Sequence, residues 1–264
     1  MKRVFGHVLA GLSVLAGGAS VTSACVHDDS TIFVFDVLAP QEVSNGQLCT
    51  YNSDTTQNYL SSGMADIDFI DGYVPTYLVG NQMVPQGNPT TPQDETSYVI
   101  IQGAIVRITD SAGNQLTTFT RLTSGPIPPL SGTTPSFTPI SVLTIDRDTL
   151  DSATVVSVVT SGGIARLVTY VRFFGQTTGG DSVESGEFEF PVDVCKGCLI
   201  SFAPQDISPD YPAPNCAGAV GSSSTGTASV QTLPIPCTPG QDIPIDCSQC
   251  QSIRDCAPNG PYNK

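Results

Sequence analysis

Two pairs of cysteines have a spacing that could support chemistry. They form the Cys-X-X-Cys units Cys195–Cys198 and Cys247–Cys250, in a chain with nine cysteines. Such units bind zinc, attach haem or exchange disulfides, depending on their surroundings. The long spacing between the units argues against a four-cysteine zinc site, and c-type haem needs a histidine where Leu199 and Gln251 stand. A redox role needs the first cysteine at a helix N-terminus, whereas Cys195 ends a predicted strand, so we expect structural disulfides.

Acidic residues form a second candidate site. Asp66, Asp68 and Asp71 precede Gly72 in a pattern that partly resembles a calcium-binding loop. An EF-hand loop needs acids at alternate positions and a more distant Glu, and the spacing departs from this at Asp71. We therefore expect Asp66 and Asp68 on the solvent face of a strand. We expect neither a bound metal nor another cofactor.

Groups for nucleophilic catalysis are scarce. His27 is the one histidine beyond the first 24 residues, and the chain has no Trp and no Gly-X-Ser-X-Gly motif. Asp181, Glu184 and Glu187 lie close in sequence and could act as paired carboxylates on a glycoside. A solvated hairpin face also explains these three acids. We expect no catalytic residue and no enzymatic activity.

The chain is strongly acidic and sparsely charged. It has 10 basic and 24 acidic residues among 264, and 13% of its residues are charged, against about 25% in a typical soluble domain. Without Lys2 and Arg3 the balance is 8 basic to 24 acidic residues. Such a surface argues against nucleic-acid binding, which needs a basic patch, and against electrostatic binding to anionic lipid.

The first 24 residues have the layout of a secretory signal peptide. Lys2 and Arg3 begin it, residues 4–15 are mostly apolar, and residues 16–24 are mostly small. The apolar stretch is shorter than the ~20 residues that a membrane-spanning helix needs. We therefore predict an exported protein.

The end of this segment, Val21-Thr22-Ser23-Ala24-Cys25, resembles a bacterial lipobox. The resemblance implies that Cys25 receives the lipid and becomes the first residue, with residues 25–30 as a lipidated tether in the outer membrane or periplasm. Ordinary cleavage after Ala24 is the alternative. Several acyl chains on one residue anchor a protein stably.

The cysteine count favours lipidation, because removing Cys25 leaves an even number that can all pair in an oxidising compartment. Seven of these eight cysteines lie after residue 194, so one of the seven needs a partner elsewhere. We therefore expect Cys49 to form a disulfide with the tail. The cysteines expected in disulfides are Cys49, Cys195, Cys198, Cys216, Cys237, Cys247, Cys250 and Cys256.

Between residues 31 and 194 the apolar pattern repeats every second residue, as in half-buried strands. The run 98–108 should place Tyr98, Ile100, Ala104, Val106 and Ile108 on one face, and residues 111–114 should turn it into a hairpin. Segment 148–159 fits either a strand or a short helix that Asp148 caps. The predicted strands are 32–38, 47–51, 64–70, 73–79, 98–108, 115–121, 138–145, 164–174 and 183–194.

This pattern predicts an all-β fold, an antiparallel immunoglobulin-like β-sandwich over 31–194, with a small barrel as the alternative. Residues 195–264 differ, since they contain seven cysteines and ten prolines. We expect a disulfide-rich tail dominated by loops.

Several segments together resemble a family of uncharacterised cysteine-rich lipoproteins of myxobacteria and related bacteria. They are 77–82, 179–191, 195–199, 236–242 and 246–250. The resemblance covers most of residues 31–256 and implies a location in the cell envelope. Val26 after the lipidated cysteine, in place of Asp, implies the outer membrane. The resemblance supplies no catalytic or binding residue.

Together these patterns predict a cell-envelope lipoprotein that acts as a non-enzymatic structural or binding module. Its partners would be the lipid anchor in the membrane and an envelope protein, with no nucleic acid. The alternative is a lipoprotein that binds glycans or calcium, or an enzyme that acts on an envelope polymer. Exposed aromatic residues such as Tyr170 could stack on sugar rings in that case.

Overall fold

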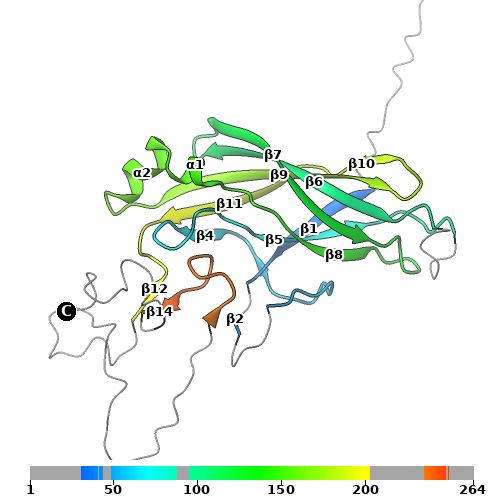
Figure 1. Ribbon diagram of the computed structural model, residues 1–264, viewed down its shortest axis with the longest axis horizontal. Coiled ribbons are helices and arrows are strands. Elements are labelled where there is room, and N and C mark those ends of the chain that lie inside the picture. The colour runs from blue at the N-terminus through cyan, green and yellow to red at the C-terminus, as the bar shows by residue number, and fades with distance from the viewer. Residues whose placement is uncertain are drawn as a thin grey trace, which may run out of the picture.

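The computed structural model describes residues 31–40, 42–43, 49–87, 95–202, 235–247 and 249 (Figure 1). Strands dominate these residues, so the all-β fold class is confirmed. No helix in these ranges is long and apolar enough to cross a membrane.

A four-stranded antiparallel sheet forms one layer. Its order is β3 (Tyr59–Leu60), β1 (Ile32–Leu38), β5 (Thr76–Asn81) and β8 (Ser136–Ser141). Every residue of β5 is buried, because strands flank it on both sides. Apolar residues occupy both faces of β1 from Ile32 to Phe35, so this strand has an apolar side that does not point into the core.

The larger sheet has the order β4 (Gly63–Asp66), β11 (Phe188–Cys195), β9 (Ala165–Thr177), β6 (Val99–Asp110) and β7 (Gln115–Ile127), and β10 (Ser182–Glu184) also pairs with β9. The pair β4–β11 is parallel, so the prediction of a purely antiparallel arrangement is wrong at this edge. More than 100 residues separate the two strands along the chain. No short turn therefore forces them to run in opposite directions.

Two short strand pairs involve the tail, one within it and one that joins it to the first part of the chain. Strand β12 (Ile200–Ser201) pairs in parallel with β14 (Ile245–Asp246), and β13 (Ile235–Pro236) pairs in antiparallel with β2 (Glu42–Val43). In Figure 1 these strands lie below the two main sheets.

One apolar core joins the two main sheets. Ile32 and Val79 of the four-stranded sheet belong to the same buried cluster as Val106 and Val171 of the larger sheet. Across this interface the rings of Tyr77 and Phe173 lie edge to face, with 5.5 Å between their centroids. The sheets therefore pack against each other through their inner faces, and the immunoglobulin-like topology stays a prediction.

Strand β6 differs from the predicted face pattern. Val99 and Ile101 are buried, as are Ala104, Val106 and Ile108, whereas Ile100 is 41% exposed. The pairing shifts by one residue between Ile101 and Gly103, and such a bulge moves all later side chains to the other face. A Cβ on Gly103 would lie 2.7 Å from the carbonyl oxygen of Arg121 on β7, so the bulge requires glycine.

Most other predicted elements are present with shifted bounds. The hairpin at 111–114 is confirmed, and Asp110 closes it by accepting bonds from the N–H groups of Ala112 and Asn114 at 2.9 and 2.8 Å. In β11, Phe190, Val192 and Val194 are buried at every second position, as the period-two apolar pattern predicts. The strand predicted over 64–70 ends at 66, the one over 73–79 begins at 76, and residues 49–51 of the predicted strand 47–51 are not in a strand.

Segment 148–159, for which the sequence fits either a strand or a short helix, is helical. It forms α1 (Arg147–Leu150) and α2 (Ala153–Val159), with the valines Val155 and Val159 of α2 buried one turn apart. Asp146, not Asp148, caps α1, because its carboxylate accepts the N–H of Thr149 at 3.1 Å. Burial on one side explains why a valine-rich segment adopts a helix here.

Candidate functional site

Four aromatic rings lie together on the outer face of the four-stranded sheet. They come from Phe33 and Phe35 on β1, Tyr59 on β3 and Phe137 on β8, and we call them the aromatic face. The ring of Phe35 lies 5.6 Å from that of Tyr59 and 5.3 Å from that of Phe137, between centroids. None of the four belongs to the buried core, and Phe35 is 42% exposed.

A glycine in the middle of the sheet positions two of these rings. Gly80 on β5 pairs with Phe33 on one side and with Phe137 on the other. A Cβ at Gly80 would lie 2.6 Å from Phe33 and 2.9 Å from Phe137. The two rings therefore fill the space above Gly80, edge to face, with 5.9 Å between centroids.

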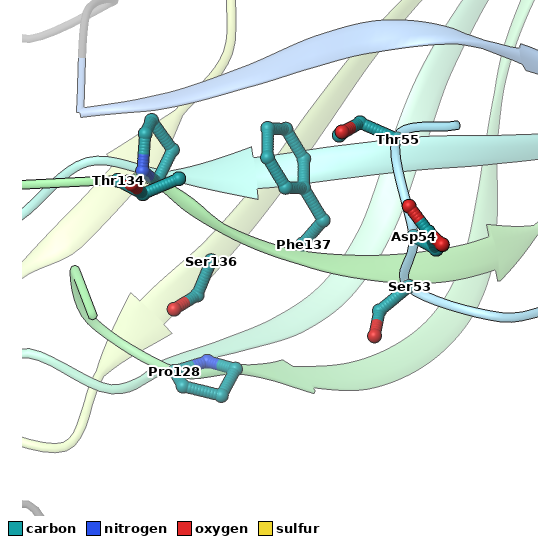
Figure 2. A pocket seen from close by; sticks show the side chains of 8 residues that line it. Ser53, Asp54, Thr55, Pro128, Thr134, Ser136 and Phe137 are labelled. Atoms are coloured by element: carbon teal, nitrogen blue, oxygen red, sulfur yellow. The ribbon is translucent and has the colours of Figure 1, made fainter. Parts of the chain in front are cut away.

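A pocket of about 360 Å³ adjoins the aromatic face (Figure 2). Phe137, Pro128 and Pro135 supply its apolar wall. Hydroxyl groups and one carboxylate supply the polar wall, from Ser53, Asp54, Thr55, Thr134 and Ser136. None of the described residues that line this pocket is basic, so its chemistry suits a neutral group better than an anion.

The loop on the polar side of the pocket is ordered by its own hydrogen bonds. The side chain of Gln57 donates to the carbonyl oxygens of Asn52 and Asp54 at 2.6 and 2.7 Å. The N–H of Thr56 donates to Asp54 at 2.8 Å and lowers the pKa of that exposed carboxyl group. Asp54 is thus an ionised acceptor at neutral pH.

The basic side chains of the described residues are all engaged in ion pairs. Their carboxylate partners are Glu187 for Arg107, Asp146 for Arg121, Asp71 and Asp151 for Arg147, Asp193 for Arg166, Glu184 for Arg172 and Asp68 for Lys196. Within these ranges no cation is left to bind a phosphate group. Glu184 and Glu187, two of the acids considered as paired carboxylates, therefore lie beside arginines.

Tyr170, the residue considered for stacking on sugar rings, has an arginine over its ring. The guanidinium carbon of Arg107 lies 3.8 Å from the centroid of the Tyr170 ring, so one face is covered. The aromatic face on the opposite sheet was not anticipated from the sequence.

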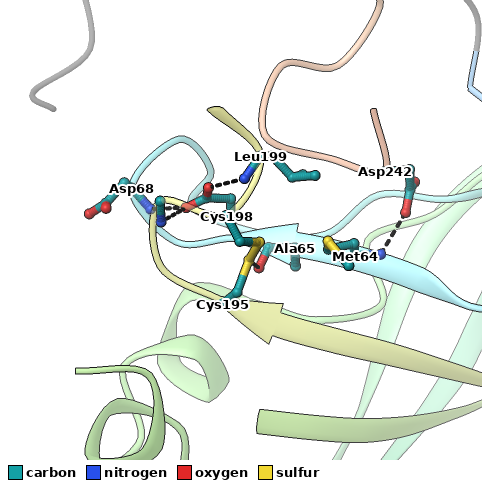
Figure 3. Close-up of a disulfide and its surroundings, with 9 residues drawn as sticks. Met64, Ala65, Asp68, Cys195, Cys198, Leu199 and Asp242 are labelled. Atoms are coloured by element: carbon teal, nitrogen blue, oxygen red, sulfur yellow. Dashed lines mark hydrogen bonds between the residues drawn. A yellow bond between two sulfur atoms is a disulfide. The ribbon is translucent and has the colours of Figure 1, made fainter. Parts of the chain in front are cut away.

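Asp66 is completely buried, and its predicted position on a solvent face is wrong. Its carboxylate accepts N–H groups from Gly197 at 2.8 Å, Leu199 at 2.9 Å and Asp68 at 3.1 Å. Strand β4 ends at Asp66, so this side chain caps the loop that comes after β11 instead of pointing outward. Figure 3 shows this loop with the disulfide of Cys195 and Cys198 beneath Leu199.

The other acids of the calcium-like segment point elsewhere. Asp68 was also expected to face solvent, but only 10% of its side chain is exposed, and it pairs with Lys196 at 3.2 Å. Asp71 forms an ion pair with Arg147 on α1. With Asp66 bonded to backbone N–H groups, the three carboxylates do not converge on one point.

The disulfide Cys49–Cys237 joins the tail to the first part of the chain, beside the pair β2–β13. A link across 188 residues restricts the unfolded chain strongly and stabilises by about 5 kcal/mol on loop-entropy grounds, against about 2 kcal/mol for a Cys-X-X-Cys link. Cys247 is also disulfide-bonded. Cys25, His27, Cys216, Cys250 and Cys256 lie outside the described residues.

Asp242 anchors the tail in the fold. Its carboxylate accepts the N–H of Met64 at 2.7 Å and the hydroxyl of Tyr73 at 2.9 Å. Next to it, the side-chain amide of the buried Gln241 pairs with both backbone groups of Val74. Burial raises the pKa of Asp242 to about 6, although these hydrogen bonds oppose the shift.

Comparison with known proteins finds no matching family model and no significant match among curated proteins. Membership of the lipoprotein family that the sequence motifs resemble stays a prediction.

Proposed function

We propose that this protein is an exported lipoprotein of the cell envelope whose aromatic face binds a partner protein without catalysis. The signal-peptide layout and the lipobox-like run that ends at Cys25 support the location. The exposed ring of Phe35, with the half-buried rings of Phe33, Tyr59 and Phe137 around it, supports the binding role and carries the proposal.

Clusters of exposed aromatic side chains mark interaction sites, because they bury a large apolar area at low entropic cost. The surroundings of the cluster indicate the partner's chemistry. Asp36 and Asp54 lie near Tyr59, where partial burial and then these two charges raise the pKa of its hydroxyl group. The partner surface that fits this face is apolar at its centre and basic at its rim.

Photo-crosslinking tests the proposal. Phe35 is replaced with p-benzoylphenylalanine in the full chain, and Leu122, which is 86% exposed on β7 of the other sheet, is replaced in a matched control. After irradiation in cells we expect one discrete adduct from position 35 and none from position 122. The adduct should be lost when Phe137→Ala is added. No adduct at position 35, or equal adducts at both positions, would contradict the proposal.

The pocket beside Phe137 favours a second candidate, the binding of a neutral saccharide. Its hydroxyl groups, single carboxylate and apolar wall match what sugar hydroxyls and sugar faces contact, and its volume of about 360 Å³ holds one ring. Thermal-shift measurements with neutral envelope oligosaccharides test it, since a ligand of the native state raises the melting temperature. The rise should vanish in Asp54→Asn and persist in the control Glu189→Gln. A flat response of the unmodified protein would remove this candidate.

A further inference from the structure

The two sulfurs of the Cys-X-X-Cys disulfide lie in different environments. Cys195 is the last residue of β11 and is 2% exposed, whereas Cys198, three residues later in the loop, is exposed. A thiolate from outside can therefore reach Cys198 but not Cys195. In Figure 3, Cys195 lies at the end of its strand and Cys198 on the loop above it.

The loop keeps its shape through contacts that do not involve the disulfide. The buried carboxylate of Asp66 accepts the N–H groups of Gly197 and Leu199 from inside the loop, at 2.8 and 2.9 Å. Gly197 has a φ of 68°, in the left-handed region that glycine adopts without strain. The backbone of Ile67 also donates to the carbonyl oxygen of Cys195 at 3.0 Å. With these bonds in place, the disulfide can open without loss of the loop.

We propose that the Cys195–Cys198 disulfide is a thiol–disulfide exchange site that oxidises a vicinal dithiol of another protein, with Cys198 as the sulfur that is attacked. A short link whose loop is held by other bonds contributes less to stability than Cys49–Cys237 with its separation of 188 residues. One exposed and one buried sulfur is the arrangement that directs attack to a single atom.

The reaction balances in two displacements. One thiolate of the partner attacks the sulfur of Cys198, the bond between Cys198 and Cys195 breaks, and its electron pair leaves with Cys195. The partner's second thiolate then attacks the mixed disulfide and releases Cys198. Two electrons and two protons pass to the Cys195–Cys198 pair, which becomes a dithiol, and the partner dithiol becomes a disulfide.

Asp66 acts as a positioning residue in this site. One of its oxygens and the two sulfurs lie within 4.8 Å of one another. Its negative charge disfavours a thiolate on Cys195 and so holds the equilibrium toward the disulfide. Only a dithiol that is itself a strong reductant would drive the exchange to completion.

Redox titration of the full chain tests the proposal. The protein is equilibrated with mixtures of reduced and oxidised dithiothreitol, alkylated and analysed by mass spectrometry, while circular dichroism monitors the fold. We expect the Cys195–Cys198 peptide to become reduced while Cys49–Cys237 stays oxidised and the spectrum is unchanged. Reduction of both disulfides together, reduction only on unfolding, or capture of zinc by the reduced pair would overturn the proposal.

Single variants identify the attacked sulfur. Cys195→Ser leaves Cys198 as a thiol, and Cys198→Ser leaves Cys195, and each is incubated with glutathione disulfide. We expect at least a tenfold faster glutathione adduct on Cys198 than on Cys195. Equal rates, or a faster reaction at Cys195, would contradict the assignment.

The role of Asp66 has its own readout. We expect Asp66→Asn to shift the exchange equilibrium toward the dithiol by more than twofold at pH ~8.5, where a free thiol is half ionised. In Asp71→Asn, a control acid paired with Arg147, the equilibrium should stay within twofold. An unchanged equilibrium in a folded Asp66→Asn protein would show that Asp66 only supports the loop.

Discussion

Asp242 combines two unusual features in one residue. Its φ of 64° is the one positive value at a described residue other than glycine, and its carboxylate is buried between Met64 and Tyr73. Asp tolerates the left-handed region better than most residues, because its short side chain bonds locally. The residue therefore fixes the backbone of the tail and places an acid inside the protein.

The raised pKa of Asp242 has a consequence for stability. Its value in the fold is about 6, above the 3.8 of an exposed Asp, so the folded state binds the proton more tightly than the unfolded state. The stability that Asp242 contributes through this proton is complete below pH 3.8, and it is lost as the pH rises through 6. The difference between the pKa values of Asp242 in the folded and unfolded states corresponds to about 3 kcal/mol of unfolding free energy.

Urea unfolding of the wild type and of Asp242→Asn at several pH values measures this effect. Asn keeps an acceptor oxygen and tolerates the same backbone. We expect the variant to gain stability relative to the wild type between pH 4 and 6, by an amount that levels off above 6. A constant difference across this window, or the same trend in the control Asp148→Asn, would contradict the assignment.

A second prediction at the scale of single residues concerns Gly80. In Gly80→Ala the new methyl group would overlap the rings of Phe33 and Phe137, so these rings must move. We expect a loss of about 1–3 kcal/mol in unfolding free energy and a weaker adduct in the crosslinking experiment. The matched control is Gly186→Ala, where a Cβ would meet nothing within 4 Å. Equal stabilities of the two variants would show that the rings do not rest on Gly80.

At the scale of elements, local patterns predicted the features that depend on neighbours along the chain. The alternation in β11 was correct because burial on one face of a strand has period two. The predicted face of β6 was correct for Ala104, Val106 and Ile108 and wrong for Ile100, which lies before the bulge, because the bulge at Gly103 depends on contact with the backbone of Arg121 on another strand. Sequence spacing alone does not contain that contact.

The loop held by Asp66 and the aromatic face also depend on contacts between residues far apart in the sequence. Asp66 accepts bonds from residues 131 and 133 positions away, and the aromatic face assembles only when β8, β5, β1 and β3 take their register. The signal for the aromatic face was the run Ile32-Phe33-Val34-Phe35, which is apolar on both faces of a strand. An apolar outer face predicts either a covering layer or a binding surface.

The two disulfides should differ in their effect on stability. Removal of the long link in Cys49→Ala/Cys237→Ala should lower the unfolding free energy by about 2–5 kcal/mol. The pair Cys195→Ala/Cys198→Ala should cost less, since Asp66 also holds that loop. Urea unfolding without reductant measures both. A larger loss for the second pair would show that the short disulfide is needed for the fold.

At the scale of the whole molecule, the prediction to test is that a lipid on Cys25 holds the protein at a membrane. We expect mass spectrometry of the N-terminal peptide to find Cys25 as the first residue with its acyl chains attached. Cys25→Ser should release the protein from the membrane fraction, whereas the double variant at Cys49 and Cys237 should stay there. An unmodified Cys25, or a Cys25→Ser protein that stays in the membrane, would contradict lipidation.

The pairing of every described basic side chain with a carboxylate has a consequence for neighbouring molecules. No described cation is free to bridge to an acid of a second copy, and the excess of 24 acidic over 10 basic residues makes two copies repel each other. Salt confines this repulsion to about 8–10 Å. Copies held by the proposed lipid anchor would stay apart in the plane of the membrane, and each aromatic face would remain open to a partner of opposite charge instead of pairing with a second copy.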